Sequence, residues 1–294
     1  MKKEYLNLTY EKKNILITGG AGFIGSNLSK ILINQGHKVV SIDDYSFGKK
    51  ENEHSDVRYI NNDIEKISNI DEPIDICFHL AAKARVQPSF DDPVDYFRVN
   101  TKGTMKVMEW AKKNNVKVVY AGSSSKHFSP EDSPYAMYKY LGEQVCKLYK
   151  KSYNLNVEIA RFYNVYGPRE NRDEKFGNVI GIWTTKALRG EPLPIVGDGT
   201  QRRDFTHVND IVDGLIKIGF SDISQDEGWE LGTGNNYSIN ELFEMFRTRF
   251  NAKSVFIPDQ PGNYKKTLRK NDNLINLLNW KPKDRLANHI SNLS

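Results

Sequence analysis

Residues 18–25, Thr18-Gly19-Gly20-Ala21-Gly22-Phe23-Ile24-Gly25, combine the spacings Gly-x-Gly-x-x-Gly and Gly-x-x-Gly-x-x-Gly. The apolar run 14–18 comes directly before the glycines, and apolar residues at helical spacing follow them. Glycines between a strand and a helix let backbone N–H groups and the helix N-terminus approach a pyrophosphate. Asp43 ends the next strand-like run, 38–43, where a carboxylate can accept hydrogen bonds from ribose hydroxyls. The stretch therefore predicts a dinucleotide site, and the neighbouring carboxylate of Asp44 favours NAD because it would repel the 2′-phosphate of NADP.

Strand-like and helical segments alternate through the first half of the chain. Further strand-like runs occupy 57–60, 74–80, 116–121 and 157–161, with helical stretches at 93–114 and 134–153. Strands that alternate with helices predict a parallel sheet covered on both faces. After about residue 166, glycines and prolines interrupt the pattern, which indicates a second lobe that walls a cleft over the strand ends. We predict an α/β protein with a Rossmann-type doubly wound parallel sheet and a smaller C-terminal substrate-binding lobe.

Composition narrows the possible partners of the protein. The chain has 294 residues and a formal net charge of +5, with basic residues spread along it, which argues against a nucleic-acid binder. No apolar run approaches the roughly 18 residues of a membrane span, so no membrane association is expected. Cys77 and Cys146 lack metal-ligand spacing and fall in apolar or helical segments, which predicts two buried free thiols and no metal site. The polar segment 1–13 lacks the apolar core of a signal peptide, and a cytoplasmic location is expected.

Tyr135 and Lys139 lie four residues apart in a predicted helix that begins at Pro134. Residues at this spacing share one face of a helix. A lysine cation beside a phenol favours the phenolate, so we expect the pKa of Tyr135 to be lowered. Such a phenol can remove a proton from a sugar or alcohol hydroxyl. The spacing alone is weak evidence, since it also occurs by chance in exposed helices.

A series of further motifs follows the glycine cluster in a fixed order. They are Asn61-Asn62-Asp63-Ile64, His79-Leu80-Ala81-Ala82, Asn100 with Gly103-Thr104, Tyr120-Ala121-Gly122-Ser123-Ser124-Ser125, the segment 161–169 and the segment 197–210. With Tyr135 and Lys139, they make residues 14–282 resemble the extended short-chain dehydrogenases/reductases. Within that superfamily, the chain is most similar to the NAD-dependent nucleotide-sugar epimerase/dehydratase family, and to members of the UDP-glucose 4-epimerase type.

The resemblance implies a role for each matched position. The implied catalytic residues are Ser123, Tyr135 and Lys139. The implied NAD-binding residues are Gly19, Gly22, Phe23, Ile24, Gly25, Asp43, Asp44, Asp63, Ile64, Leu80, Ala81, Ala82, Asn100, Tyr163 and Val165. The implied substrate-binding residues are Ser124, Ser125, Asn164, Asn178, Val179 and Arg203. Tyr163 is expected near the nicotinamide, and Arg203 is expected to face the diphosphate of a nucleotide-diphosphate sugar as a bidentate donor.

The resemblance also implies how the chain is divided and assembled. Residues 1–165 would form the NAD-binding domain, and 204–232 would return to it. The substrate-binding lobe would then consist of 166–203 and 233–294. A homodimer is expected through the helices at 93–114 and 134–153.

The implied reaction is inversion at C4 of a UDP-sugar through a 4-keto intermediate. Dehydratases of the family carry Asp-Glu directly after the catalytic threonine, where this chain has Ser124 and Ser125, so epimerisation is favoured over dehydration. A 4,6-dehydratase, a 4-keto-sugar reductase and a catalytically inactive NAD-binding protein remain the alternatives.

Several positions depart from the family pattern. Lys126-His127-Phe128 replaces the usual Val-Tyr-Gly, and the loop from there to Tyr135 is short, so part of a substrate wall should be missing. Lys83 replaces a small polar or apolar residue. Gln260 stands where one of two diphosphate-clamping arginines is usual, with Lys265, Lys266 and Arg269 as candidate substitutes. We therefore expect a cleft with ordinary catalytic groups and an unusual substrate pocket.

Overall fold

A computed structural model describes residues 11–294 of the chain. Residues 1–10 lie outside the described residues, and with them most of the segment 1–13 that was predicted to lack a signal peptide. Within the described part, no helix is both long and apolar enough to cross a membrane. Cys77 and Cys146 are buried free thiols, as predicted.

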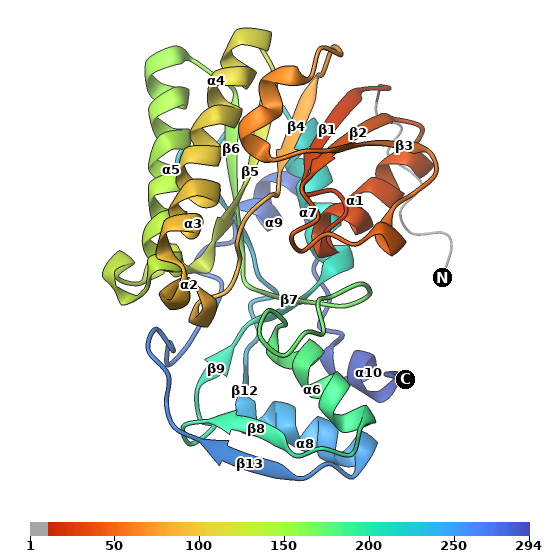
Figure 1. Cartoon of the computed structure of the whole chain (residues 1–294), viewed down its shortest axis with the longest axis vertical. Helices are drawn as coiled ribbons and strands as arrows, with labels where there is room; N and C mark the ends of the chain where they lie inside the picture. Colours follow the sequence, from red (N-terminus) through yellow and green to blue (C-terminus); the bar gives the residue numbers. More distant parts are fainter. Residues whose placement is uncertain (1–10) are drawn as a thin grey trace.

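The centre of the molecule is a seven-stranded parallel sheet with the strand order β11-β6-β5-β4-β1-β2-β3 (Figure 1). Its strands are β1 (Asn14–Thr18), β2 (Lys38–Asp43), β3 (Val57–Asn61), β4 (Ile76–His79), β5 (Lys117–Ser123), β6 (Val157–Phe162) and β11 (Trp229–Leu231). Every neighbouring pair runs parallel, and Ile15 of β1, for example, aligns with Val39 of β2 and Ile76 of β4. The predicted doubly wound fold is confirmed.

Helices cover both faces of the sheet because the strands are apolar on both faces. Ile15 and Ile17 of β1 pack with helices α1 (Phe23–Asn34) and α7 (Val208–Phe220) on one face. Leu16, which points the other way, belongs to the cluster that includes residues of α4 (Thr104–Asn114) and α5 (Pro134–Tyr153). Successive strand residues face opposite sides, so a single apolar run supplies both cores.

The predicted helix 93–114 is interrupted by a different helical geometry. It consists of α3 (Pro93–Phe97), a π-helical segment η3 (Arg98–Gly103) and α4. π-helical turns inside helices are frequent near functional sites. Here the π segment carries Asn100, whose side chain reaches the loop after β4. The short helix α2 (Gln87–Asp91) and the 3-10 turns η1 (Lys50–Asn52), η2 (Ile64–Asn69), η4 (Ser124–His127) and η5 (Pro130–Asp132) complete this part.

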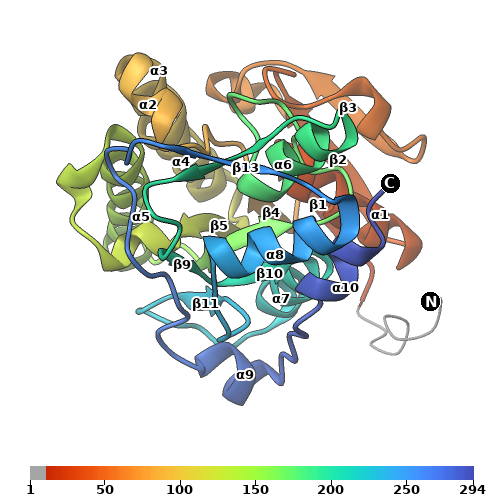
Figure 2. The ribbon, with the colours of Figure 1, turned by 90° about the horizontal axis from the view of Figure 1, so that it is seen from below.

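A second group of elements lies below the sheet in Figure 1 and in front of it when seen from below in Figure 2. It has its own apolar core, with Trp183, Leu242 and Phe246 fully buried or nearly so. Its elements are α6 (Val179–Leu188), β8 (Leu193–Val196), α8 (Ile239–Phe250), β13 (Ser254–Ile257) and α10 (Leu286–Ser291). Short strands join the two groups, and they are β7 (Asn164–Tyr166), β9 (Arg202–Arg203), β10 (Phe205–His207) and β12 (Tyr237–Ser238). The helix α9 (Asn273–Leu278) packs against α7 and β11.

Candidate active site

A cleft of about 1160 Å³ lies at the carboxyl ends of the central strands. Its lining starts at the glycine turn after β1, passes the ends of β2, β4, β5 and β6, and continues to α6 and the loop 260–264. Ligands of open α/β sheets bind at this edge, because the loops that leave the strand ends diverge there. Every site residue predicted from the sequence lines this cleft, with the exception of Asn100.

At the glycine turn after β1, the backbone lies close to the loop after β4 and to the start of helix α1. Gly19 has a φ of 75°, and a Cβ there would lie 3.0 Å from the backbone of Ala81. A Cβ on Gly25 would lie 2.2 Å from the carbonyl oxygen of Gly19. Helix α1 begins after Gly22 with no side-chain cap and no acidic residue in its first turn. Its first N–H groups therefore suit an anion, which fits the pyrophosphate of a dinucleotide.

Asp43 closes the other side of this turn. Its carboxylate accepts hydrogen bonds from the backbone N–H groups of Ala21 and Tyr45, each at 2.9 Å. Burial raises the pKa of Asp43, while these two donors act in the opposite direction. Its carboxylate lines the cleft with that of Asp44, as a group that binds ribose hydroxyls must. The residues present thus fit an NAD molecule along the edge formed by β1 and β2.

Asn100 lies behind the wall of the cleft. Its side-chain oxygen accepts a hydrogen bond from the Lys83 N–H, and its nitrogen donates to the Lys83 carbonyl, both at 2.9 Å. The residue is buried, with 2% of its surface exposed. Asn100 therefore holds the loop after β4 in place and does not line the space available to a ligand.

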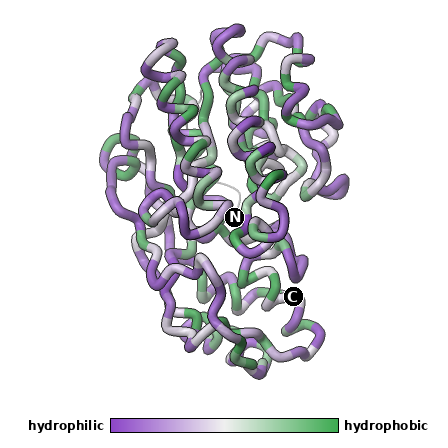
Figure 3. The backbone as a smooth tube through the Cα atoms, turned by 60° about the vertical axis from the view of Figure 1, so that its left-hand side comes forward, coloured by the Kyte–Doolittle hydropathy of each residue, from purple (hydrophilic) through white to green (hydrophobic). Residues whose placement is uncertain are grey.

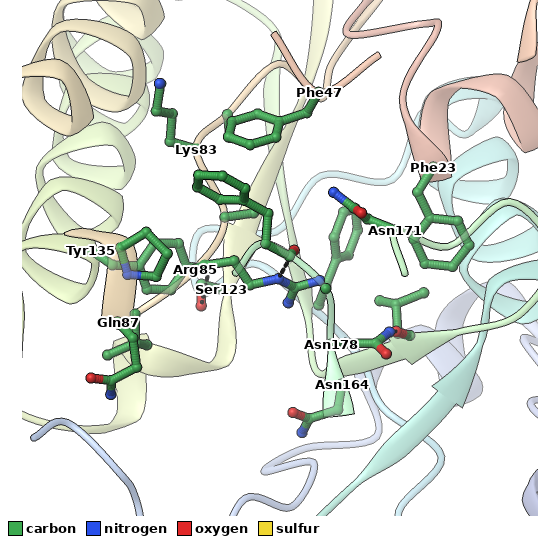
Figure 4. A pocket seen from close by; sticks show the side chains of 18 of the residues that line it. Phe23, Phe47, Lys83, Arg85, Gln87, Ser123, Tyr135, Asn164, Asn171 and Asn178 are labelled. Carbon is green, nitrogen blue, oxygen red and sulfur yellow. Dashed lines mark hydrogen bonds between the residues drawn. The ribbon is translucent and has the colours of Figure 1, made fainter. Parts of the chain in front are cut away.

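Tyr135 and Ser123 meet at the end of β5. The Tyr135 hydroxyl donates a hydrogen bond to the Ser123 oxygen at 3.3 Å, and Ser125 donates to the same oxygen from its N–H and its hydroxyl. Tyr135 lies in the first turn of α5, where Ser133 caps the helix and Pro134 occupies the first position. The helix start thus aims the phenol at the strand end (Figure 4).

The predicted effect of Lys139 on Tyr135 is wrong for this structure. Burial raises the pKa of Tyr135, and the opposing contributions come from the Ser123 hydrogen bond and the charge of Arg85. The Lys139 ammonium turns to the Ala121 carbonyl at 2.5 Å and lies 4.7 Å from the centre of the Tyr120 ring. Burial also lowers the pKa of Lys139 to about 8. The i, i+4 spacing placed both residues in the cleft, but the packing of the lysine directs its charge to a backbone carbonyl.

The predicted substrate-binding residues come from both groups of elements. Asn178 caps α6 through the N–H of Gly181 at 2.6 Å, and Asn164 donates to Thr267 at 3.2 Å. Arg203 donates to the Tyr264 carbonyl at 2.6 Å and to the Asn263 side chain at 2.5 Å. Burial lowers the pKa of Arg203 to about 10. Ser124, Ser125 and Val179 line the cleft between these side chains.

The unusual segment 126–128 stabilises the wall from outside the cleft. His127 shares a hydrogen bond of 3.0 Å with buried Glu230 and is not among the residues that line the cleft. Phe128 stacks on Tyr264 with 3.8 Å between ring centres. Tyr264 lines the cleft, and the loop 260–264 packs against the short 126–134 loop, since a Cβ on Gly262 would lie 3.3 Å from the Asp132 carbonyl oxygen.

Sequence reasoning missed Arg85, Phe47 and Phe176. Arg85 lines the cleft and donates from its Nε to the Phe176 carbonyl at 2.8 Å. Phe47 and Phe176 both line the cleft and meet edge to face, with ring centres 4.8 Å apart. Arg85 stands three residues beyond the His79-Leu80-Ala81-Ala82 strand end, and a basic residue so close to that edge is the signal that could have revealed it. None of Lys265, Lys266 and Arg269 lines the cleft, so they do not replace the arginine missing at Gln260.

The comparisons with known proteins agree with this geometry. Residues 15–221 match the family described as the NAD dependent epimerase/dehydratase family. The chain belongs to this family. Among curated family members, the UDP-glucose 4-epimerase of Mycolicibacterium smegmatis is 32% identical over 306 aligned positions, gaps included, and the alignment covers 94% of this chain and 96% of that one.

Solved structures of family members superpose closely on this one. A UDP-glucose 4-epimerase of Thermotoga maritima with UDP-glucose has a TM-score of 0.89 and 29% identity, with 95% of this chain and 97% of that chain covered. A UDP-N-acetylglucosamine 4-epimerase of Methanobrevibacter ruminantium, in complex with UDP-N-acetylmuramic acid, has a TM-score of 0.87 and 32% identity, with 97% of both chains covered. The predicted family, fold and NAD dependence are therefore confirmed.

Glu170 gives this epimerase/dehydratase family member a testable pH dependence. Burial raises the pKa of Glu170 from an ordinary value near 4.5 to about 7, against a hydrogen bond from Asn178 at 2.9 Å. The folded state therefore holds a proton that the unfolded state loses, and this stabilisation disappears as the pH rises through 7. We expect Glu170→Gln to be more stable than the wild type at pH 8, by roughly 2–4 kcal/mol more than at pH 5. Urea denaturation of both proteins at the two pH values measures the difference, and parallel changes in the two proteins would contradict this assignment.

Proposed function

We propose that the protein is an NAD-dependent nucleotide-sugar epimerase that inverts C4 of a UDP-sugar. The observation that supports this most is the pairing of Tyr135 with Ser123 at 3.3 Å, in a cleft where Ser124 and Ser125 follow the catalytic position. Hydroxyls at 124 and 125 cannot supply the acid and base that water elimination requires. The similarity to UDP-sugar 4-epimerases across nearly the whole chain supports the same reaction.

The residues of the chain have distinct tasks in this reaction. NAD⁺, when bound, supplies the redox step by accepting a hydride from C4 and returning it. Tyr135, in its ionised form, takes the proton of the C4 hydroxyl and gives it back to the product. Ser123 holds the same oxygen through a hydrogen bond. Burial raises the pKa of Tyr135, and the Ser123 hydrogen bond and the charge of Arg85 act in the opposite direction. Lys139 is proposed to bind the nicotinamide ribose. Burial lowers its pKa to about 8, which still leaves it largely cationic at pH 7.

The substrate side of the cleft is proposed to hold the UDP group. The N-terminus of α6, which follows Asn178, and the guanidinium of Arg203 are the groups suited to a diphosphate. Asn164 and Val179 contribute to the same wall. Residues 1–165 with 204–232 are proposed as the NAD-binding domain, and 166–203 with 233–294 as the substrate lobe. A cytoplasmic location is proposed on the basis of the two free thiols.

Turnover of a panel of nucleotide sugars tests the function directly. Purified protein is incubated with UDP-, GDP- and dTDP-sugars without added cofactor, and the products are followed by NMR. Interconversion of a UDP-sugar and its C4 epimer is the expected result. A 4-keto-6-deoxy product would instead indicate a dehydratase, and steady NADH consumption with a keto sugar would indicate a reductase.

We also propose a homodimer formed through α3, α4 and α5, which lie side by side in Figure 1. Large apolar side chains are exposed on these helices, namely Val94, Phe97, Met105, Leu148 and Tyr153. Figure 3 turns this side forward and shows apolar positions among the hydrophilic ones of these helices. An exposed apolar face of this kind is typical of an interaction surface.

A single charge on this face should weaken the dimer. Val94 is 74% exposed, so Val94→Glu should leave the folded protomer intact and place a carboxylate in the proposed interface. Light scattering is expected to give a dimeric mass for the wild type and a protomer mass, or at least a tenfold weaker dimer, for the variant. Val255→Glu, at an exposed position on β13, is the control and should remain dimeric. A wild-type protein of protomer mass would contradict the proposal.

A further inference from the structure

Six basic side chains line the cleft in the described part of the chain, and half of them are neutralised. Lys83 pairs with Asp95, Lys175 with Asp91, and Lys186 with Glu174 and Glu191. The remaining three, for which no carboxylate partner is found, are Lys139, Arg203 and Arg85. The proposed function assigns Lys139 to the nicotinamide ribose and Arg203 to the diphosphate, which leaves Arg85 without an assigned anion.

Arg85 is a cation held in the pocket by one hydrogen bond. Its Nε donates to the Phe176 carbonyl at 2.8 Å, and none of the ion pairs of residues 11–294 includes it. A guanidinium carries five N–H donors, so the two terminal nitrogens keep donors for another group. Burial lowers the pKa of Arg85, against the opposing charges of Tyr135 and Glu170, and the Glu170 carboxyl forms no ion pair with Arg85 within residues 11–294. A partly desolvated cation of this kind gains most from an anion that arrives with the ligand.

The position of Arg85 determines which part of a bound ligand it would contact. The charges of Arg85 and Tyr135 are close enough for each to shift the pKa of the other. In Figure 4 the Arg85 side chain extends across the pocket from the side of Tyr135 and Ser123 toward Asn178. Tyr135 and Ser123 mark the reacting C4, so Arg85 lies beside the sugar ring and not at the uridine end of the cleft.

We propose that Arg85 binds a carboxylate carried by the sugar, and that the preferred substrate is a UDP-sugar with an acidic sugar such as a hexuronic acid. The inference rests on the proposed epimerase function and specifies its substrate class. A planar guanidinium matches a carboxylate with two parallel N–H···O bonds. A neutral sugar would leave the cation with the Phe176 carbonyl alone, whereas a carboxylate would neutralise it.

The diphosphate of the substrate is another anion that Arg85 could bind, and kinetic measurements distinguish it from a sugar carboxylate. Wild type and Arg85→Gln are assayed with UDP-glucuronic acid and with UDP-glucose, and calorimetry measures the binding of UDP alone. We expect Arg85→Gln to lower kcat/KM for UDP-glucuronic acid by about 100-fold. The loss for UDP-glucose should be at least tenfold smaller, because that substrate shares only the effect of the lost Arg85 charge on the pKa of Tyr135, and the Kd of UDP should change by less than about threefold. Arg247→Gln, which removes an exposed arginine of α8, is the charge-matched control and should leave all three quantities unchanged.

Two other outcomes overturn the inference, and a third overturns only the proposed function. Equal losses for both sugars, together with weaker UDP binding, would assign Arg85 to the diphosphate. No change for either sugar would remove Arg85 from the binding site. If the wild type turns over no nucleotide sugar, the proposed function fails, but calorimetry of UDP-glucuronic acid against UDP-glucose on wild type and Arg85→Gln still tests the carboxylate site. Circular dichroism and the thermal midpoint establish that each variant is folded.

Discussion

Tyr135→Phe is expected to reduce turnover by about 10³–10⁴-fold while NAD remains bound. The phenylalanine keeps the ring in its place at the start of α5 but removes the oxygen that contacts Ser123 at 3.3 Å. The C4 hydroxyl would then have no base, because the neighbouring Ser124 and Ser125 side chains carry neutral hydroxyls. The rate is measured by NMR with the best UDP-sugar of the panel, and bound NAD is quantified after denaturation of the purified variant.

Tyr138→Phe is the matched control for this prediction. Tyr138 lies on the same helix, packs edge to face on Phe97 with ring centres 5.6 Å apart, and does not line the cleft. Loss of the Tyr138 hydroxyl should change turnover by no more than a few-fold. Turnover of Tyr135→Phe within tenfold of the wild type would remove Tyr135 from the role of base. Loss of NAD together with activity would instead indicate that the ring has a cofactor-binding role.

Arg161→Met is expected to destabilise the fold by about 3–5 kcal/mol. The Arg161 guanidinium is 3% exposed and bridges Glu143 and Glu230, which are 1% and 0% exposed, with N···O distances of 3.0–3.2 Å. Methionine preserves much of the aliphatic stem, so the main loss is the charge that compensates two buried carboxylates. Urea denaturation of the wild type and the variant measures the change in the free energy of unfolding.

Arg247→Met separates the effect of burial from the effect of losing a salt bridge. Arg247 pairs with Glu244 at 2.5 Å on α8, but the two side chains are 59% and 54% exposed. Solvent screens such a pair, and its removal should cost less than about 1 kcal/mol. Equal losses in the two variants would show that the network around Arg161 is no more important to stability than a surface pair.

The ion-pair network of Arg161, Glu143 and Glu230 also explains why the unusual segment 126–128 is compatible with an ordinary arrangement of catalytic residues. Glu230 on β11 accepts hydrogen bonds from Arg161 and Tyr163 and interacts with His127. His127 therefore stabilises the wall of the cleft from outside. Tyr163 is held directly after β6, beside the predicted nicotinamide position. The departure at 126–128 affects the support of the site, while Ser123, Tyr135 and Lys139 in the cleft keep the family pattern.

Local patterns in the sequence determined the fold and most of the cleft. The glycine turn, Asp43 and the i, i+4 pair of Tyr135 and Lys139 each depend on neighbours within one turn or one strand. Such features can be predicted because backbone geometry alone fixes where the side chains of a strand end or helix start must point. The alternation of strands and helices then determined which edge of the sheet collects them.

Tertiary structure decided the electrostatics of the site and the character of the sugar pocket. Arg85 meets the carbonyl of Phe176, 91 positions away, and His127 meets Glu230, 103 positions away. The pKa of Tyr135 is raised because the phenol is buried, and the Lys139 charge that was expected to lower it lies against the Ala121 carbonyl. Desolvation and the pairing of charges depend on which distant segments pack together. Spacing along the chain therefore located the reacting groups, and only the packed structure revealed an arginine beside them with no anion of its own.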